Sequence, residues 1–106
     1  MIKSKVKSYI GFAIKSGAII WGLDNLLTHC DKARLIIYDT SLATTGVRKL
    51  DNLLSSCDID CICLEQCCLL SELTGRDNVK LIAVTNADLA DAIRKNINIT
   101  GDGGIV

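Results

Sequence analysis

The 106-residue chain contains no proline and a single histidine, and its 12 basic and 12 acidic residues cancel to a formal net charge of +0. A neutral chain gives no general attraction to nucleic acid, which usually depends on an excess of Lys and Arg. No apolar run approaches the roughly 18 residues that cross a bilayer. The basic start, MIKSKVKSYIGFA, lacks the continuous apolar core of a signal peptide. We therefore expect a cytoplasmic protein that does not contact a membrane.

Signatures of catalysis are also missing from the sequence. His29, the single histidine, is followed directly by Cys30, and adjacent positions on a helix do not face each other. The chain shows no nucleophile paired with a base and no phosphate-binding loop motif. We expect no catalytic residues and no cofactor.

Six cysteines raise the possibility of a metal or redox site. Zinc sites usually combine C-x₂₋₄-C pairs separated by a longer loop. Cys57 and Cys61 fit one such pair, whereas the adjacent Cys67 and Cys68 are poorly placed to join them on one ion. Free cysteine also works as a small buried hydrophobe. We predict reduced thiols and no metal, with a metal or redox role as the alternative; the cysteines are Cys30, Cys57, Cys61, Cys63, Cys67 and Cys68.

Hydrophobic periodicity predicts an alternation of helices and strands in one domain, residues 1–99, followed by a flexible tail, residues 100–106. Apolar runs with β-branched residues predict strands at 18–21, 33–38, 59–64 and 81–85. Helical spacing predicts helices over 2–16, 23–30, 47–57 and 65–74, and a last helix capped by Thr85 or Asn86. This alternation indicates an α/β fold with helices on both faces of one sheet.

Local residue chemistry adds three expectations. Gly17 follows the first helix and is suited to a left-handed C-cap. Leu23, Leu26, Leu27 and Cys30 mark the inner face of the second helix. Asp39-Thr40-Ser41 offers turn and N-cap chemistry between the second strand and the third helix.

The stretch from Gly11 to Leu27, GFAIKSGAIIWGLDNLL, is the part around which the chain is organised. It contains a helix end, a short apolar strand, a glycine corner at Gly22 and a new helix start. The first N–H groups of a helix have no intrahelical acceptor, so this corner could hold a phosphate or another anion.

Three strings, in their order and spacing, carry a resemblance to a known family. They are Gly11-Phe12-Ala13 through Ser16-Gly17 to Trp21-Gly22, then LSELTG at 70–75, then LIAVTNADLADAI at 81–93. Over about residues 3–97 the chain resembles the kink-turn RNA-binding ribosomal protein family, which includes short bacterial homologues. The resemblance implies a three-layer α-β-α sandwich around a four-stranded mixed sheet, and a non-catalytic RNA-binding protein linked to the ribosome or translation.

The resemblance also implies where a structured RNA of the kink-turn type would bind. In the family, RNA is held by the corner before the second helix, typically Gly-x-Asn-Glu-x-x-Lys, and by the loop before the last strand. The corner here is Gly22-Leu23-Asp24-Asn25-Leu26-Leu27-Thr28, in which the glycine matches and the other key residues differ. The RNA-binding residues expected from the two segments and the preceding helix are Lys15, Gly22, Asp24, Asn25, Thr28, Gly75, Arg76 and Asn78.

An alternative hypothesis is a protein-interaction adaptor that keeps this scaffold and has lost kink-turn binding. Leu23 at the corner and Leu73 in the second loop would then enlarge an apolar surface for a protein partner.

Overall fold

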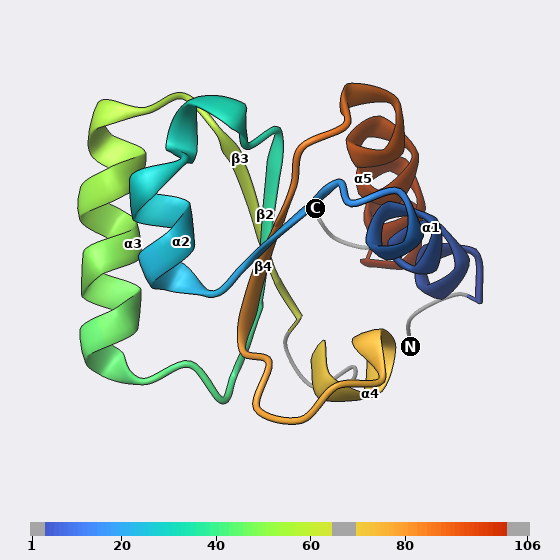
Figure 1. Cartoon of the computed structure of the whole chain (residues 1–106), viewed down its shortest axis with the longest axis horizontal. Helices are drawn as coiled ribbons and strands as arrows, with labels where there is room; N and C mark the ends of the chain where they lie inside the picture. The colour runs from blue at the N-terminus through green and yellow to red at the C-terminus, as the bar shows by residue number, and fades with distance from the viewer. Residues whose placement is uncertain (1–3, 65–69, 102–106) are drawn as a thin grey trace.

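The protein is a three-layer α-β-α sandwich, shown in Figure 1 as a computed structural model that describes residues 4–64 and 70–101. The central sheet has the strand order β1-β4-β2-β3. β2 and β3 are parallel, and β4 is antiparallel to both β1 and β2. The expected α/β class with a four-stranded mixed sheet is confirmed. The strands are β1 (Ile19–Trp21), β2 (Leu35–Asp39), β3 (Asp60–Leu64) and β4 (Leu81–Val84).

The helices form the two outer layers. α1 (Ser4–Lys15), α4 (Leu70–Thr74) and α5 (Ala87–Gly101) cover one face of the sheet in Figure 1. α2 (Leu23–Thr28), a short 3₁₀ helix η1 (Cys30–Lys32) and α3 (Thr44–Ser56) cover the other. Side chains alternate along each strand, so neighbouring residues enter different cores. Ile37 and Ile82 pack under α1, α4 and α5, whereas Ile36 and Ala83 pack under α2 and α3.

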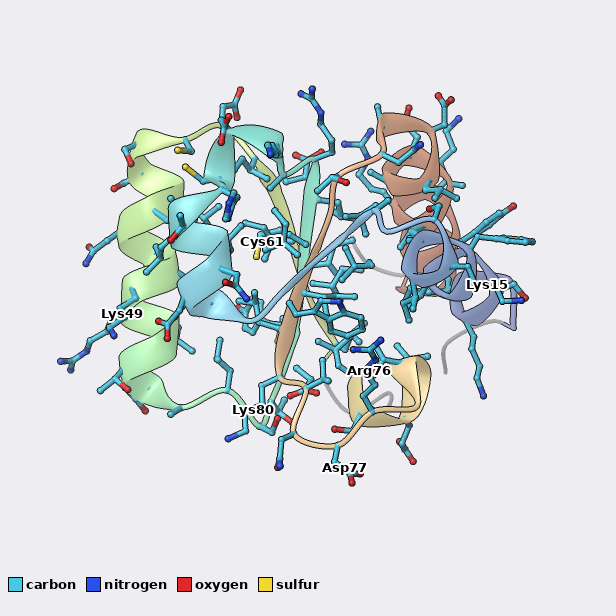
Figure 2. The ribbon with its side chains drawn as sticks, in the orientation of Figure 1. Lys15, Lys49, Cys61, Arg76, Asp77 and Lys80 are labelled. Atoms are coloured by element: carbon cyan, nitrogen blue, oxygen red, sulfur yellow. The ribbon has the colours of Figure 1, made fainter. Side chains whose placement is uncertain are left out.

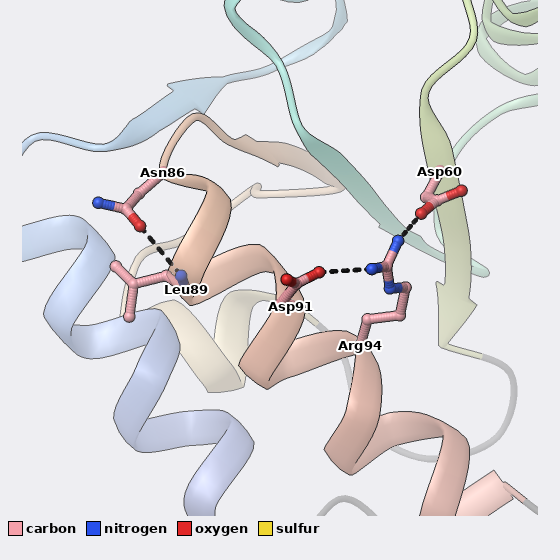
Figure 3. Close-up of polar contacts among 5 residues, drawn as sticks. All are labelled: Asp60, Asn86, Leu89, Asp91 and Arg94. Atoms are coloured by element: carbon pink, nitrogen blue, oxygen red, sulfur yellow. Dashed lines mark hydrogen bonds and ion pairs between the residues drawn. The ribbon is translucent and has the colours of Figure 1, made fainter.

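Two helix ends follow the expected local chemistry. Gly17 has φ 74° and follows α1; its N–H donates to Ile14 O at 3.1 Å, while Ala18 N–H donates to Ala13 O at 2.8 Å. These two bonds form a Schellman C-cap. At the start of α5, Asn86 Oδ1 accepts a bond from Leu89 N–H at 3.0 Å (Figure 3). The predicted Gly17 and Asn86 caps are confirmed.

The outer surface of α5 is joined to the edge strand β3 by one arginine. Arg94 pairs with Asp91 on its own helix and with Asp60 at the start of β3 (Figure 3). All three side chains are substantially exposed. Exposed ion pairs contribute roughly 0–1 kcal/mol, so this bridge adds little to the stability of the fold.

Asp39 is the buried polar residue that ties the sheet to α4. Its side chain is only 1% exposed. Oδ1 accepts bonds from Ser41 N–H at 2.9 Å and from Ser41 Oγ–H, and Oδ2 accepts a bond from Leu70 N–H at 2.7 Å. The turn chemistry expected at 39–41 is present. The N-cap expectation is wrong, because Ala43 is the N-cap of α3 and provides no side-chain bond.

Three other expectations need correction. Leu27 is 40% exposed instead of facing inward, because Leu26 takes the buried position in an α2 of only six residues. Cys30 lies outside that helix, at the start of η1. The expected tail at 100–106 begins too early, since α5 continues to Gly101 with no glycine or proline before it to end the helix. Residues 65–69 of the predicted fourth helix, and 102–106, lie outside the described residues. Within the described ranges, no helix is long and apolar enough to cross a membrane.

Candidate nucleic-acid interface

The corner between β1 and α2 depends on the backbone of Gly22. This residue has φ 83° and ψ 162°, a region that is essentially restricted to glycine. Its N–H donates to Leu81 O at 3.1 Å and its carbonyl accepts a bond from Leu26 N–H at 3.1 Å. The corner is therefore fixed between β4 and the first turn of α2. No side chain caps this helix start.

Asn25 and His29 line up along the exposed side of α2. Asn25 Nδ2 donates to the Trp21 carbonyl at 2.7 Å, which leaves Oδ1 as an acceptor at the surface. His29 Nδ1 lies 3.1 Å from Asn25 O, so a neutral His29 donates from Nδ1 and carries its free acceptor at Nε2. Lys32 follows at the end of η1, one helical turn beyond His29.

These three polar residues line a hollow of about 320 Å³ beside strand β1. β1 is an edge strand of the sheet, so its outer side is uncovered by another strand. None of the lining residues is acidic, and Lys32 supplies a positive charge. The hollow is lined by Gly17, Ile19, Ile20, Trp21, Asn25, His29, Lys32 and Thr85.

The loop between α4 and β4 lies against the same corner. The guanidinium of Arg76 lies over the Trp21 ring, 4.2 Å from its centroid, and Figure 2 shows Arg76 between α4 and the sheet. Such a cation–π contact is worth roughly 0.5–1 kcal/mol at an exposed site. The loop backbone turns at Asn78, with φ 61°, a left-handed conformation that asparagine tolerates well. Trp21 thus joins the two predicted RNA-binding segments, by its carbonyl to Asn25 and by its ring to Arg76.

The predicted site residues fall into two groups. Gly22, Asp24, Asn25 and Thr28 belong to the corner, and Gly75, Arg76 and Asn78 belong to the loop that reaches it. Of these seven, Asn25 alone lines the hollow. Lys15 ends α1 in the opposite helical layer, and Asp24 and Thr28 are exposed on α2, where Thr28 Oγ1 donates to Asp24 O at 3.2 Å.

Sequence reasoning missed three residues of this surface, namely Trp21, His29 and Lys32. The spacing of Asn25, His29 and Lys32 (i, i+4, i+7) is the signal that could have placed them on one helical face. The role of Trp21 has no local signal, because its partner Arg76 lies 55 positions further along the chain.

The apolar partner surface expected at Leu23 and Leu73 is not formed. Leu73 is 8% exposed and belongs to the core under α1 and α5. Leu23 packs against the other core, under α2 and α3. The two residues therefore lie on opposite faces of the sheet, and that expectation is wrong.

The cysteines give no candidate metal centre within the part of the chain that the structure describes, where no three His, Cys, Asp or Glu side chains converge. Cys57 contacts Cys30 rather than Cys61. Burial, followed by the neighbouring Cys63, raises the pKa of Cys61 to about 11 and that of Tyr38 to about 12. The Cys61 thiol and the Tyr38 hydroxyl therefore stay protonated at neutral pH, and Cys61 serves as a small packing residue. Cys67 and Cys68 lie outside the described residues.

Comparison with known proteins supports the fold. No family model and no curated protein matches the chain. Among solved structures, a protein of unknown function from Bacillus halodurans C superimposes with a TM-score of 0.79 at 17% identity. The alignment covers 91% of this chain and 99% of that protein. At this identity the likeness establishes a shared fold and no shared activity.

Proposed function

We propose that this chain is a non-catalytic RNA-binding protein of the kink-turn-binding ribosomal type, acting in the cytoplasm in connection with the ribosome or translation. The observation that carries the proposal is the contact between Arg76 and Trp21. It places the loop before β4 against the β1–α2 corner, the two segments through which the resembled family holds RNA.

The chemistry of the surface fits a folded RNA. Arg76 and Lys32 can each neutralise a phosphate, and the exposed guanidinium face of Arg76 offers a base a flat cation on which to stack. Asn25 Oδ1 can accept a bond from a base amino group, as asparagine does in base-edge recognition. The hollow beside β1 has apolar walls that can contact a base or ribose turned out of the RNA helix.

The charges predict modest affinity with measurable salt dependence. Two cations contact the RNA in this arrangement, while the exposed Asp24 lies in the first turn of α2, next to Asn25. Each phosphate contact adds about 0.9 to the slope of log affinity against log salt in duplex DNA, so two contacts predict a slope near −1.8. Losing one good base-edge pair costs roughly 1–3 kcal/mol of discrimination. We expect micromolar to sub-micromolar binding.

The test is a titration of labelled kink-turn RNA at two salt concentrations, with an unkinked duplex of the same composition as the control RNA. Arg76→Ala and Lys32→Ala should each weaken binding and lower the salt slope by about 1. Lys49→Ala is the matched control, because Lys49 is exposed on α3, away from the hollow (Figure 2). An unchanged slope in Arg76→Ala removes Arg76 from the site. Equal binding of both RNAs refutes kink-turn recognition and leaves RNA binding without selectivity for the kink.

A further inference from the structure

Two helix ends in the same layer share a short sequence repeat. Asp24–Cys30 reads DNLLTHC and Asp51–Cys57 reads DNLLSSC. Both cysteines follow the end of a helix: Cys30 opens η1 two residues after α2, and Cys57 is the C-cap of α3. The repeat thus delivers one thiol from each of two neighbouring helix ends.

The two thiols are in contact. Cys57 Sγ–H donates to Cys30 Sγ across 3.8 Å, and both cysteines are free and partly exposed. A disulfide bond is about 2.05 Å long, so the sulfur atoms must approach by about 1.8 Å to form one. Because Cys30 is the first residue of η1 and Cys57 is the C-cap of α3, rotation of the two side chains with a small backbone adjustment can supply this movement.

From this contact we propose that Cys30 and Cys57 are a redox-active pair that closes reversibly into an intramolecular disulfide, with glutathione disulfide as the oxidant. One protein thiolate attacks a sulfur of glutathione disulfide, whose S–S bond breaks to release one glutathione. The second protein thiolate then attacks the mixed disulfide and releases the other glutathione. The protein loses two electrons and two protons, and one glutathione disulfide becomes two thiols.

The surroundings set the speed and the consequence of this reaction. The hydrogen bond with Cys57, followed by burial, raises the pKa of Cys30 above that of an ordinary thiol. Attack by the Cys30 thiolate is therefore slow at neutral pH and faster in alkali, because the thiolate is the attacking species. Cys30 lies between His29 and Lys32, which line the hollow. The new bond would attach this wall of the hollow to the end of α3.

The pair can be identified chemically in the full chain. The reduced protein is equilibrated with glutathione buffers from reduced to oxidised, quenched with acid and labelled with N-ethylmaleimide. A protease that cleaves before aspartate then releases 24–30 and 51–57, each with one cysteine, and leaves the other four cysteines in 60–76. We expect loss of both labelled peptides and appearance of the 24–30/51–57 linked peptide as the buffer becomes oxidising, with full recovery in reducing buffer.

Matched samples keep the test decisive. Unfolded wild-type protein in urea should give much less of the linked peptide, Cys57→Ser should abolish it, and Cys61→Ser should retain it. The proposal is overturned if 24–30 and 51–57 stay separately labelled or glutathionylated in the most oxidising buffer. It is also overturned if either peptide links chiefly to 60–76, or if native and unfolded protein give equal yields. All of these readouts are independent of RNA binding.

Discussion

Replacing Asp39 with alanine should lower the free energy of unfolding more than replacing any exposed residue. The carboxylate is 1% exposed and is the shared acceptor for donors on two different segments. In Asp39→Ala, Leu70 N–H at the start of α4 loses its 2.7 Å bond, and Ser41 N–H loses its 2.9 Å bond. The Leu70 bond is buried, so water cannot readily replace the lost acceptor.

The size of the effect follows from these two bonds. A hydrogen bond to a charged group contributes roughly 1.5–3 kcal/mol, and a buried donor left unpaired costs roughly 1–3 kcal/mol. Since the Ser41 turn is only partly buried, it can be partly rehydrated. We expect a loss of about 3 kcal/mol in the free energy of unfolding. A domain of this size is stable by roughly 5–15 kcal/mol, so the loss is large but leaves a folded protein.

Urea denaturation measures this loss, followed by far-UV circular dichroism and by the fluorescence of Trp21. Asp58→Ala is the control, because Asp58 is exposed between α3 and β3; its effect should stay within about 0.5 kcal/mol. Asp39→Asn keeps one acceptor oxygen, so its loss in the free energy of unfolding should lie between those of Asp39→Ala and Asp58→Ala. The reasoning is refuted if Asp39→Ala and Asp58→Ala unfold at the same urea concentration.

Three further predictions use the same unfolding assay. Gly22→Ala should cost about 1–3 kcal/mol, because φ 83° with ψ 162° strains any side-chain-bearing residue; no loss would contradict this corner geometry. Ile82→Ala should cost about 2–5 kcal/mol by leaving a cavity, whereas Leu27→Ala should cost less than 1; equal losses would refute the assigned burial. With pKa values of about 11 for Cys61 and about 12 for Tyr38 in the fold, against about 9.0 and 10.0 when unfolded, the unfolded chain loses these protons first. The free energy of unfolding should therefore be highest below about pH 9, as far as these two groups are concerned, and fall as the pH rises from 9 to 12. A urea midpoint that stays constant over this range would contradict the raised pKa values.

The secondary structure was largely readable from the sequence because its signals are local. The apolar run ARLIIY at 33–38 predicts a strand from its composition alone, and its last four residues, Leu35–Tyr38, belong to β2. The caps at Gly17 and Asn86 are also local, since each depends on backbone groups within five residues. The choice between Leu26 and Leu27 could not be made in this way. A helix of six residues gives too short a window for its periodicity to define the buried face.

Contacts between distant residues were not readable from one sequence. Asp39 and Leu70 are 31 positions apart in the sequence, and Cys30 and Cys57 are 27 apart. Each pair is in contact because the sheet, with the strand order β1-β4-β2-β3, brings the elements that carry them together. A turn residue such as Asp39 has the same local signature whether its second oxygen is hydrated or bonds α4. Its structural importance therefore becomes visible only with the tertiary fold.

Because the fold decides which charges lie close together, the net charge of the chain is a poor guide to the charge of the candidate interface. At physiological salt, charges interact over about 8 Å, so an RNA phosphate at the hollow responds to the groups around it and much less to the whole chain. The groups lining the hollow include Lys32 and His29 and no acid, although the formal net charge is +0. A salt slope that falls in Lys32→Ala and stays unchanged in Lys49→Ala would locate RNA at the hollow, and equal slopes in the two variants would place it elsewhere on the surface.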